Sequence, residues 1–236
     1  MNKPSVNSVQ LLLIIGFLTS LFFTSKLSAN TGGDEGVGVG KDLPTHNAQR
    51  IVALAPHIVE SLYEIGAGDR IVGTVSYADY PEAALKIPRI GGYHGLQIEK
   101  VLALNPDLII VWKTGNKAVD IERLEKLNLP LAYSDAKSID GVAAELRLFG
   151  QLTGLNEAAE KSAIAFEKNL SSIRSQYQNT SDIAVFYQLW SEPLMSVNKN
   201  TWIHQLVEVC GASNVFGESS TDYPQISIEN VLLAKP

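Results

Sequence analysis

The stretch IVALAPHIVESLYEIGAGDRIVG, residues 51–73, decides the fold. It begins with a short apolar run typical of a strand, and it continues with apolar residues at helical spacing as far as Gly66. A second apolar run follows at residues 71–73. A strand, a helix and a strand in this order predict a parallel sheet with a right-handed crossover.

The end of the chain repeats this order of motifs. The corresponding segments are 183–186 with 51–54, 208–211 with 64–66, 215–217 with 71–73, 222–224 with 79–81, and 228–236 with 98–106. A period of this length is too long for a solenoid repeat. It predicts two similar Rossmann-like lobes, and lobes of this kind commonly hold a ligand between them.

The rest of the first lobe also has an α/β pattern. Residues 108–112 (LIIVW) form a continuous apolar run, which indicates a parallel strand buried on both faces. An amphipathic helix is expected at 117–127 and a strand at 131–133. From 138 to 177 no strand pattern occurs, and apolar residues at three- and four-residue steps predict a long helix.

These patterns divide the chain into an N-terminal lobe at 50–137, a connecting helical segment at 138–180 and a C-terminal lobe at 181–236. In the first copy the repeat continues into the 108–112 strand, whereas the second copy stops at Pro236. We therefore expect an α/β fold of two similar parallel-sheet lobes joined by a long rigid helix, with the second lobe truncated. The missing part would include an apolar strand and at least one further helix.

The N-terminus has the composition of an export signal. Lys3 precedes an apolar run at 11–23, and small residues follow at 28 and 29, so residues 1–29 are predicted to be a cleaved signal peptide. A retained membrane anchor is the alternative, although the run is short for a span. Residues 30–49 are predicted to be a flexible leader. Its GVGVGK segment (36–41) lacks the flanking strand and helix that a phosphate loop requires.

Charge and chemistry exclude several classes of function. Removing residues 1–29 lowers the basic count from 19 to 17 against 25 acidic residues, a net charge of −8, which disfavours a nucleic-acid partner. The motifs of hydrolases and metalloenzymes are absent, so no catalytic residue, metal or cofactor is predicted. The four histidines are expected on the surface or in loops. Cys210 is the one cysteine, which is unusual for an exported protein.

Aromatic residues recur where strands give way to loops. The carboxyl ends of parallel strands line the ligand crevice of such folds, and aromatic faces there suit a large, planar, partly apolar ligand. The alternative is that these rings fill the core. The candidate ligand-binding residues are Tyr77, Tyr93, Trp112, Trp190 and Tyr223.

Two acidic residues occupy the same position in the two repeats. Glu99 and Glu229 each follow an isoleucine at the start of a predicted helix. A carboxylate in the first turn of a helix is stabilised by the helix dipole, by about 0.3 to 1 kcal/mol. Equivalent acids on two lobes could also form a two-point footprint for a symmetric partner.

Several of these segments together resemble one family. Residues 56–66, 76–81, 95–99, 102–108 with Trp112, and 206–211 look like the periplasmic vitamin B12-binding proteins of cobalamin ABC importers. These belong to the helical-backbone (class III) substrate-binding proteins for metal chelates and corrinoids. The resemblance covers the chain from about residue 50 to its end.

The resemblance implies a monomeric, non-enzymatic periplasmic protein that binds cobalamin or a related corrinoid and delivers it to the transmembrane permease. Tyr77 and Trp112 match the family's corrin-contacting residues, and Glu99 and Glu229 match its transporter-docking acids. Tyr93 and Tyr223 stand where other members carry Trp, and Trp190 lies near a family contact. The disulfide partner of Cys210 is implied to lie beyond Pro236. Iron-siderophore or haem binding on the same fold, and an exported enzyme using the same cleft, are the alternatives.

Overall fold

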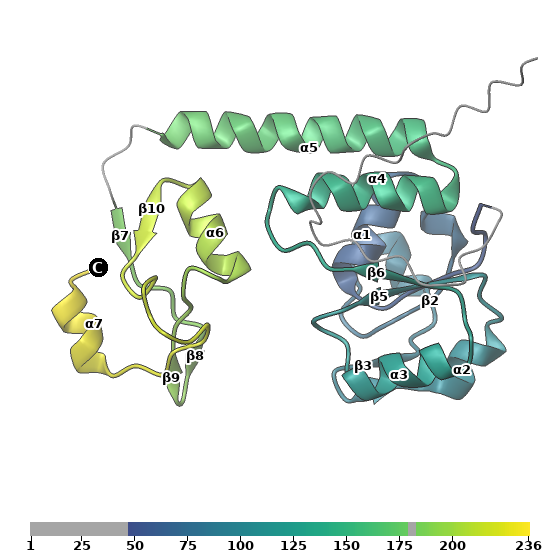
Figure 1. The fold of residues 1–236 in the computed structure, drawn as a ribbon, viewed down its shortest axis with the longest axis horizontal. Helices are drawn as coiled ribbons and strands as arrows, with labels where there is room; N and C mark the ends of the chain where they lie inside the picture. Colours follow the sequence, from purple (N-terminus) through teal and green to yellow (C-terminus); the bar gives the residue numbers. More distant parts are fainter. Residues whose placement is uncertain (1–46, 179–182) are drawn as a thin grey trace, which may run out of the picture. The chain divides into compact units, whose positions relative to one another are not determined.

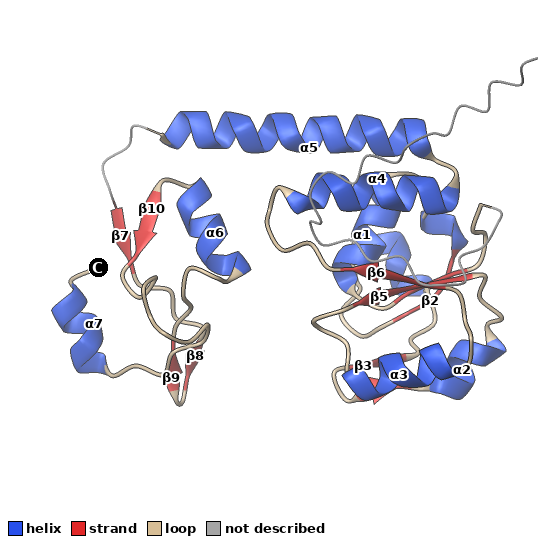
Figure 2. Cartoon of the chain, viewed as in Figure 1, coloured by secondary structure: helices blue, strands red, loops and turns tan. Residues whose placement is uncertain are grey.

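The structure, a computed structural model, describes residues 47–178 and 183–236. The predicted signal peptide and residues 30–46 of the predicted leader lie outside these ranges. The first lobe is built on a four-stranded parallel sheet (Figures 1 and 2). Its strands, in spatial order, are β2 (Ile71–Thr74), β1 (Ile51–Ala53), β5 (Leu108–Trp112) and β6 (Leu131–Ser134).

Helices cover both faces of this sheet. Ile51, Ala53, Leu108 and Ile110 point to a core shared with α1 (Pro56–Glu64). Val52, Ile109 and Val111 point to the opposite core, which α2 (Ile98–Ala103) and α3 (Ala118–Lys126) cover. Successive residues of one strand thus enter different cores, as the period of a strand requires. The prediction that the 108–112 strand is buried on both faces is confirmed.

The segment predicted as a connector contains two helices. Gly154, in the left-handed region with φ 74°, ends α4 (Gly141–Thr153), and α5 (Asn156–Tyr177) follows with 22 residues. Helix α4 packs on the first lobe, since Ala143, Leu146 and Phe149 belong to the same core as α1. The long helix expected from the apolar spacing is α5, and its residues Ala159 and Ala163 also reach this core.

The second lobe has a two-stranded parallel sheet of β7 (Ile183–Val185) and β10 (Ala212–Asn214). Helix α6 (Trp202–Val209) connects them, with the β8 (Trp190–Ser191) and β9 (Leu194–Met195) hairpin before it. The second strand of this lobe was expected at 215–217, but the structure has it three residues earlier, as β10. In the first lobe a 3₁₀ turn, η1 (Gly68–Arg70), separates the helix from its strand, whereas β10 follows α6 after Cys210 and Gly211.

Helix α7 (Ile228–Ala234) completes the described chain and contributes no buried residue. Its Leu232 and Leu233, together with Ile183 of β7, are exposed apolar side chains. Cys210 is exposed and free, so its disulfide stays a prediction. None of the helices in the described ranges is both long and apolar enough to cross a bilayer.

Candidate functional site

Three of the five predicted aromatic residues line one cavity of about 240 Å³. Tyr77 follows β2, Trp112 ends β5, and Tyr93 lies in the turn between β3 (Gly91–Gly92) and β4 (Gly95–Leu96). We call this space the aromatic cavity. Its full lining is Leu54, Ala55, Pro56, Val75, Ser76, Tyr77, Gly92, Tyr93, Leu96, Trp112, Gly115, Asn116, Lys117 and Asp120.

The two tyrosines are largely free of protein contacts. Tyr77 is 82% exposed and Tyr93 is 86% exposed, which leaves both rings available to a ligand. The backbone beneath them is fixed: the Ser76 amide donates to Gly91 O over 2.9 Å, and the Leu96 amide donates to Asp120 Oδ2 over 3.0 Å. Asp120 is buried, so its carboxylate holds the β3–β4 turn against α3.

The loop after β5 fixes Trp112. The Trp112 amide donates to Asn116 Oδ1 over 2.8 Å, and Asn116 Nδ2 donates to Leu54 O over 2.8 Å. The indole lies directly over Gly115, because a Cβ added to this glycine would stand only 1.9 Å from Trp112 Cε3. A strand end, an asparagine and a glycine thus place one indole at the wall of the cavity.

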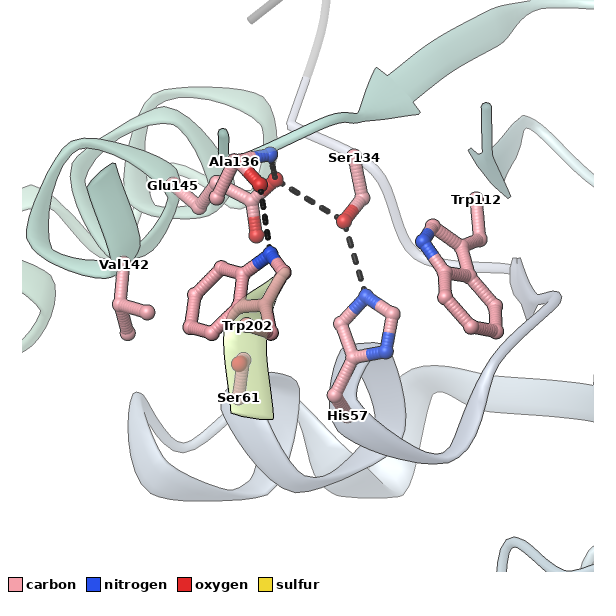
Figure 3. Close-up of a pocket in the computed structure, with 8 residues that line it drawn as sticks. All are labelled: His57, Ser61, Trp112, Ser134, Ala136, Val142, Glu145 and Trp202. Atoms are coloured by element: carbon pink, nitrogen blue, oxygen red, sulfur yellow. Dashed lines mark hydrogen bonds between the residues drawn. The ribbon is translucent and has the colours of Figure 1, made fainter. Parts of the chain in front are cut away.

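Trp112 also lines a second cavity, of about 280 Å³, which we call the polar cavity. Its lining residues are His57, Ser61, Trp112, Ser134, Ala136, Val142, Glu145 and Trp202 (Figure 3). They come from α1, the start of α6, the ends of β5 and β6, the loop after β6, and α4.

A chain of hydrogen bonds crosses the polar cavity. His57 Nε2 lies 2.9 Å from Ser134 Oγ, and Ser134 Oγ donates to Glu145 Oε1 over 2.9 Å (Figure 3). Glu145 Oε1 also accepts from the amides of Asp135 and Ala136, over 2.7 and 2.9 Å. Burial lowers the pKa of His57 to about 4, because the interior disfavours the charged imidazolium.

Sequence reasoning missed this second cavity. His57 was expected on the surface or in a loop, yet it is half-buried on α1 and its ring stands edge-on to Trp112 with the centroids 5.3 Å apart. His204 was expected on the surface or in a loop too, and it is buried on α6 beside Asn214. One signal was present: Ser134 ends β6, and His57 begins the helix that directly follows β1, so both lie near carboxyl ends of strands, where ligands bind in parallel sheets.

Trp190 and Tyr223 do not line the aromatic cavity or the polar cavity. Trp190 is on β8, and Tyr223 is in the loop that leads to α7. Backbone hydrogen bonds join the segment after β9 to the loop of Tyr223, since Ser196 donates to Pro224 O and Asn198 donates to Asp222 O. Both rings are exposed, and their part in binding stays a prediction.

The two predicted docking acids occupy matching positions. Glu99 and Glu229 stand in the first turns of α2 and α7, and both are exposed. The Ser227 side chain lowers the pKa of Glu229 through a hydrogen bond. Within the described ranges, no cluster of His, Cys, Asp and Glu has the composition of a metal site.

Comparison with known proteins identifies one family. A model of the periplasmic binding protein family matches residues 51–236. The vitamin B12-binding protein of Vibrio campbellii is 35% identical over 189 residues, which cover 80% of this chain and 69% of that protein. The crystal structure of the periplasmic vitamin B12-binding protein of Vibrio cholerae is 36% identical with a TM-score of 0.74, over 80% of this chain and 74% of that one.

A more distant relative binds a different ligand. The apo structure of a periplasmic haem-binding protein from Roseiflexus sp. RS-1 is 26% identical with a TM-score of 0.72, and it covers 80% of this chain and 74% of that one. The similarity to these structures confirms the predicted fold class, an α/β protein of two parallel-sheet lobes with a long helix.

Proposed function

Because the chain belongs to the periplasmic binding protein family, we propose that it binds cobalamin or a related corrinoid for an ABC importer. The protein is exported to the periplasm by the signal peptide predicted at residues 1–29, and it delivers the ligand to the membrane permease. Membership of this family also confirms the prediction that the chain is a transport component and not an enzyme.

The aromatic cavity is the main structural support for a corrinoid ligand. Tyr77, Tyr93 and Trp112 come from three separate segments and line one space at the carboxyl ends of parallel strands. A corrin is a large ring whose faces are mostly apolar, so aromatic side chains can cover it at a low cost in conformational entropy. The vitamin B12-binding relatives at 35 and 36% identity support the same ligand.

Haem is the competing ligand, and one residue favours it. An exposed tyrosine at a ligand cavity can coordinate ferric iron, as tyrosine does in some haem proteins, and Tyr77 is in such a position. Haem would also stack on the same aromatic rings. The choice between the two ligands therefore depends on measured affinity.

The test is a calorimetric titration of the full-length protein with cyanocobalamin, haemin and a ferric siderophore. We expect saturable one-to-one binding of cyanocobalamin, with haemin and the siderophore at least about tenfold weaker, a difference of about 1.4 kcal/mol. Tight binding of haemin or of the siderophore, without binding of cyanocobalamin, would show that the ligand class is wrong.

The docking role of Glu99 and Glu229 is also part of this proposal. Support comes from their exposure and from their equivalent positions in the two repeats. Exposed charges govern the recognition of a partner and need not affect a ligand bound elsewhere. Basic residues of the permease subunits are the complementary chemistry.

A further inference from the structure

Glu145 is a buried carboxylate with one oxygen open to the polar cavity. The residue is only 5% exposed, and its three hydrogen bonds to the described residues all fall on Oε1. Oε2 has no such bond, and every fully buried side-chain polar atom in the described part of the chain has a partner, so Oε2 is accessible from the cavity. Figure 3 shows it on the side of the carboxylate that faces Trp202.

No basic side chain in the described ranges forms an ion pair with Glu145. Lys113 and Lys137, which reach the loop after β6, both pair with Asp135, at 3.2 and 2.5 Å. The cavity therefore carries a negative group whose free oxygen can accept a hydrogen bond.

The histidine adds a second acceptor. Ser134 has one hydroxyl proton, which it donates to Glu145, so His57 Nε2 must donate to Ser134 Oγ. A neutral imidazole with its proton on Nε2 has an unprotonated Nδ1. Figure 3 shows Nδ1 on the edge of the ring toward Trp112, the residue that both cavities share.

A site with two acceptors and a negative charge suits a group that donates N–H and carries no negative charge. Corrinoids carry primary amides around the ring, whereas the corresponding arms of haem end in carboxylates. The cavity volume of about 280 Å³ is many times the roughly 10 to 15 Å³ that a cavity needs to hold one water, which is ample for one amide arm. A haem propionate in the same place would meet Glu145 with like charge.

We propose that the polar cavity binds a peripheral amide of the corrinoid, with Glu145 Oε2 accepting a hydrogen bond from the amide N–H. Glu145 disfavours ligands that have a carboxylate at this position. This inference rests on the proposed function and deepens it, because it names the residue that separates corrinoids from haem. Ser61, on the cavity wall, supplies a hydroxyl for the amide oxygen.

The test compares cyanocobalamin with the three monocarboxylic acids that form when one of its propionamides is hydrolysed. These ligands differ from the parent by one amide group only. We expect the wild-type protein to bind at least one acid at least about tenfold more weakly than cyanocobalamin, because the site is built for a hydrogen-bond donor.

The substitution Glu145→Gln should remove this discrimination. Its amide oxygen has two lone pairs and can accept two of the three hydrogen bonds of Oε1, and its NH₂ then replaces the acceptor that faces the cavity. The ratio of the two affinities should fall to within about threefold. Ser61→Lys places a cation at the cavity without touching the Glu145 contacts, and it should reduce the ratio in the same direction.

Glu157→Gln is the matched control, since it removes one exposed negative charge on α5 away from the cavity and should keep the wild-type ratio. The inference is overturned if the wild type binds all three acids as tightly as cyanocobalamin, or if folded Glu145→Gln and Ser61→Lys proteins keep the wild-type ratio. Failure of the wild type to bind cyanocobalamin would instead overturn the proposed function, and this inference with it.

Discussion

Tyr77 combines a place on the wall of the aromatic cavity with a strained backbone. Its φ of 66° is in the left-handed region, which costs a residue with a Cβ roughly 1 to 2 kcal/mol relative to its usual conformations. The ring is 82% exposed, so packing of the side chain does not repay this cost. Strain of this kind concentrates at functional sites, and here it directs a tyrosine into the aromatic cavity.

The first prediction separates strain from binding at this residue. Tyr77→Gly should be more stable than Tyr77→Ala by about 1 kcal/mol in urea unfolding, because only glycine adopts this φ freely. Both variants should lose about tenfold or more in corrinoid affinity, since both lack the ring. Tyr77→Phe keeps the ring and is the control for affinity. Equal stability of the Gly and Ala variants would contradict the role given to the backbone.

Gly115 gives a second prediction at this scale. Its φ is outside the left-handed region, so an alanine is disfavoured there only by its contact with the Trp112 ring. Gly115→Ala should therefore displace the indole and weaken corrinoid binding. In a Trp112→Ala background the same substitution should have little further effect on affinity. Additive losses in this double-mutant cycle, measured by calorimetry, would show that Gly115 acts independently of Trp112.

At the scale of elements, the sequence predicted the first lobe better than the second. Continuous apolar runs identified β1, β5 and β6, because strands buried on both faces need apolar residues at every position. Matching Val215–Gly217 to Ile71–Gly73 by identity misplaced β10, since the repeat has different connection lengths in its two copies. Three of the predicted ligand residues meet in one cavity, whereas the polar cavity depends on contacts between five separate elements.

The contacts between α1, β6 and α4 predict a dependence of stability on pH. The pKa of His57 is about 4 in the folded protein and about 6.5 when unfolded, so between these values the unfolded chain binds more protons. The stability that the neutral His57 contributes to the folded protein is therefore fully present above pH 6.5, and it is lost as the pH falls toward 4. The loss should reach about 3 kcal/mol.

Urea unfolding of His57→Gln between pH 4 and 7 checks this. Glutamine can still donate to Ser134 but does not titrate, so its stability should change with pH by up to about 3 kcal/mol less than that of the wild type. His94→Gln, at an exposed histidine, is the control and should follow the wild type. Parallel curves for His57→Gln and the wild type would mean that His57 does not titrate in this range.

Over the whole molecule, the proposed function uses one set of residues to bind the ligand and another surface to contact the permease. In the proposed function the aromatic and polar cavities hold the ligand, while Glu99 and Glu229 are exposed at the starts of α2 and α7. Neither acid lines either cavity. A partner that recognises both acids can therefore contact the protein without reaching the bound ligand, and the two functions should be separable by mutation.

The double reversal Glu99→Lys with Glu229→Lys tests this separation. Cyanocobalamin affinity should stay within about twofold of the wild type, because neither acid faces a cavity, whereas uptake by proteoliposomes containing the cognate importer should be lost. Glu82→Lys with Glu157→Lys is the matched control, since it reverses two exposed acids in the first turns of η2 (Glu82–Lys86) and α5. This control should transport normally. If the Glu99 and Glu229 double variant also transports at the wild-type rate, the two acids serve only to stabilise the first turns of their helices.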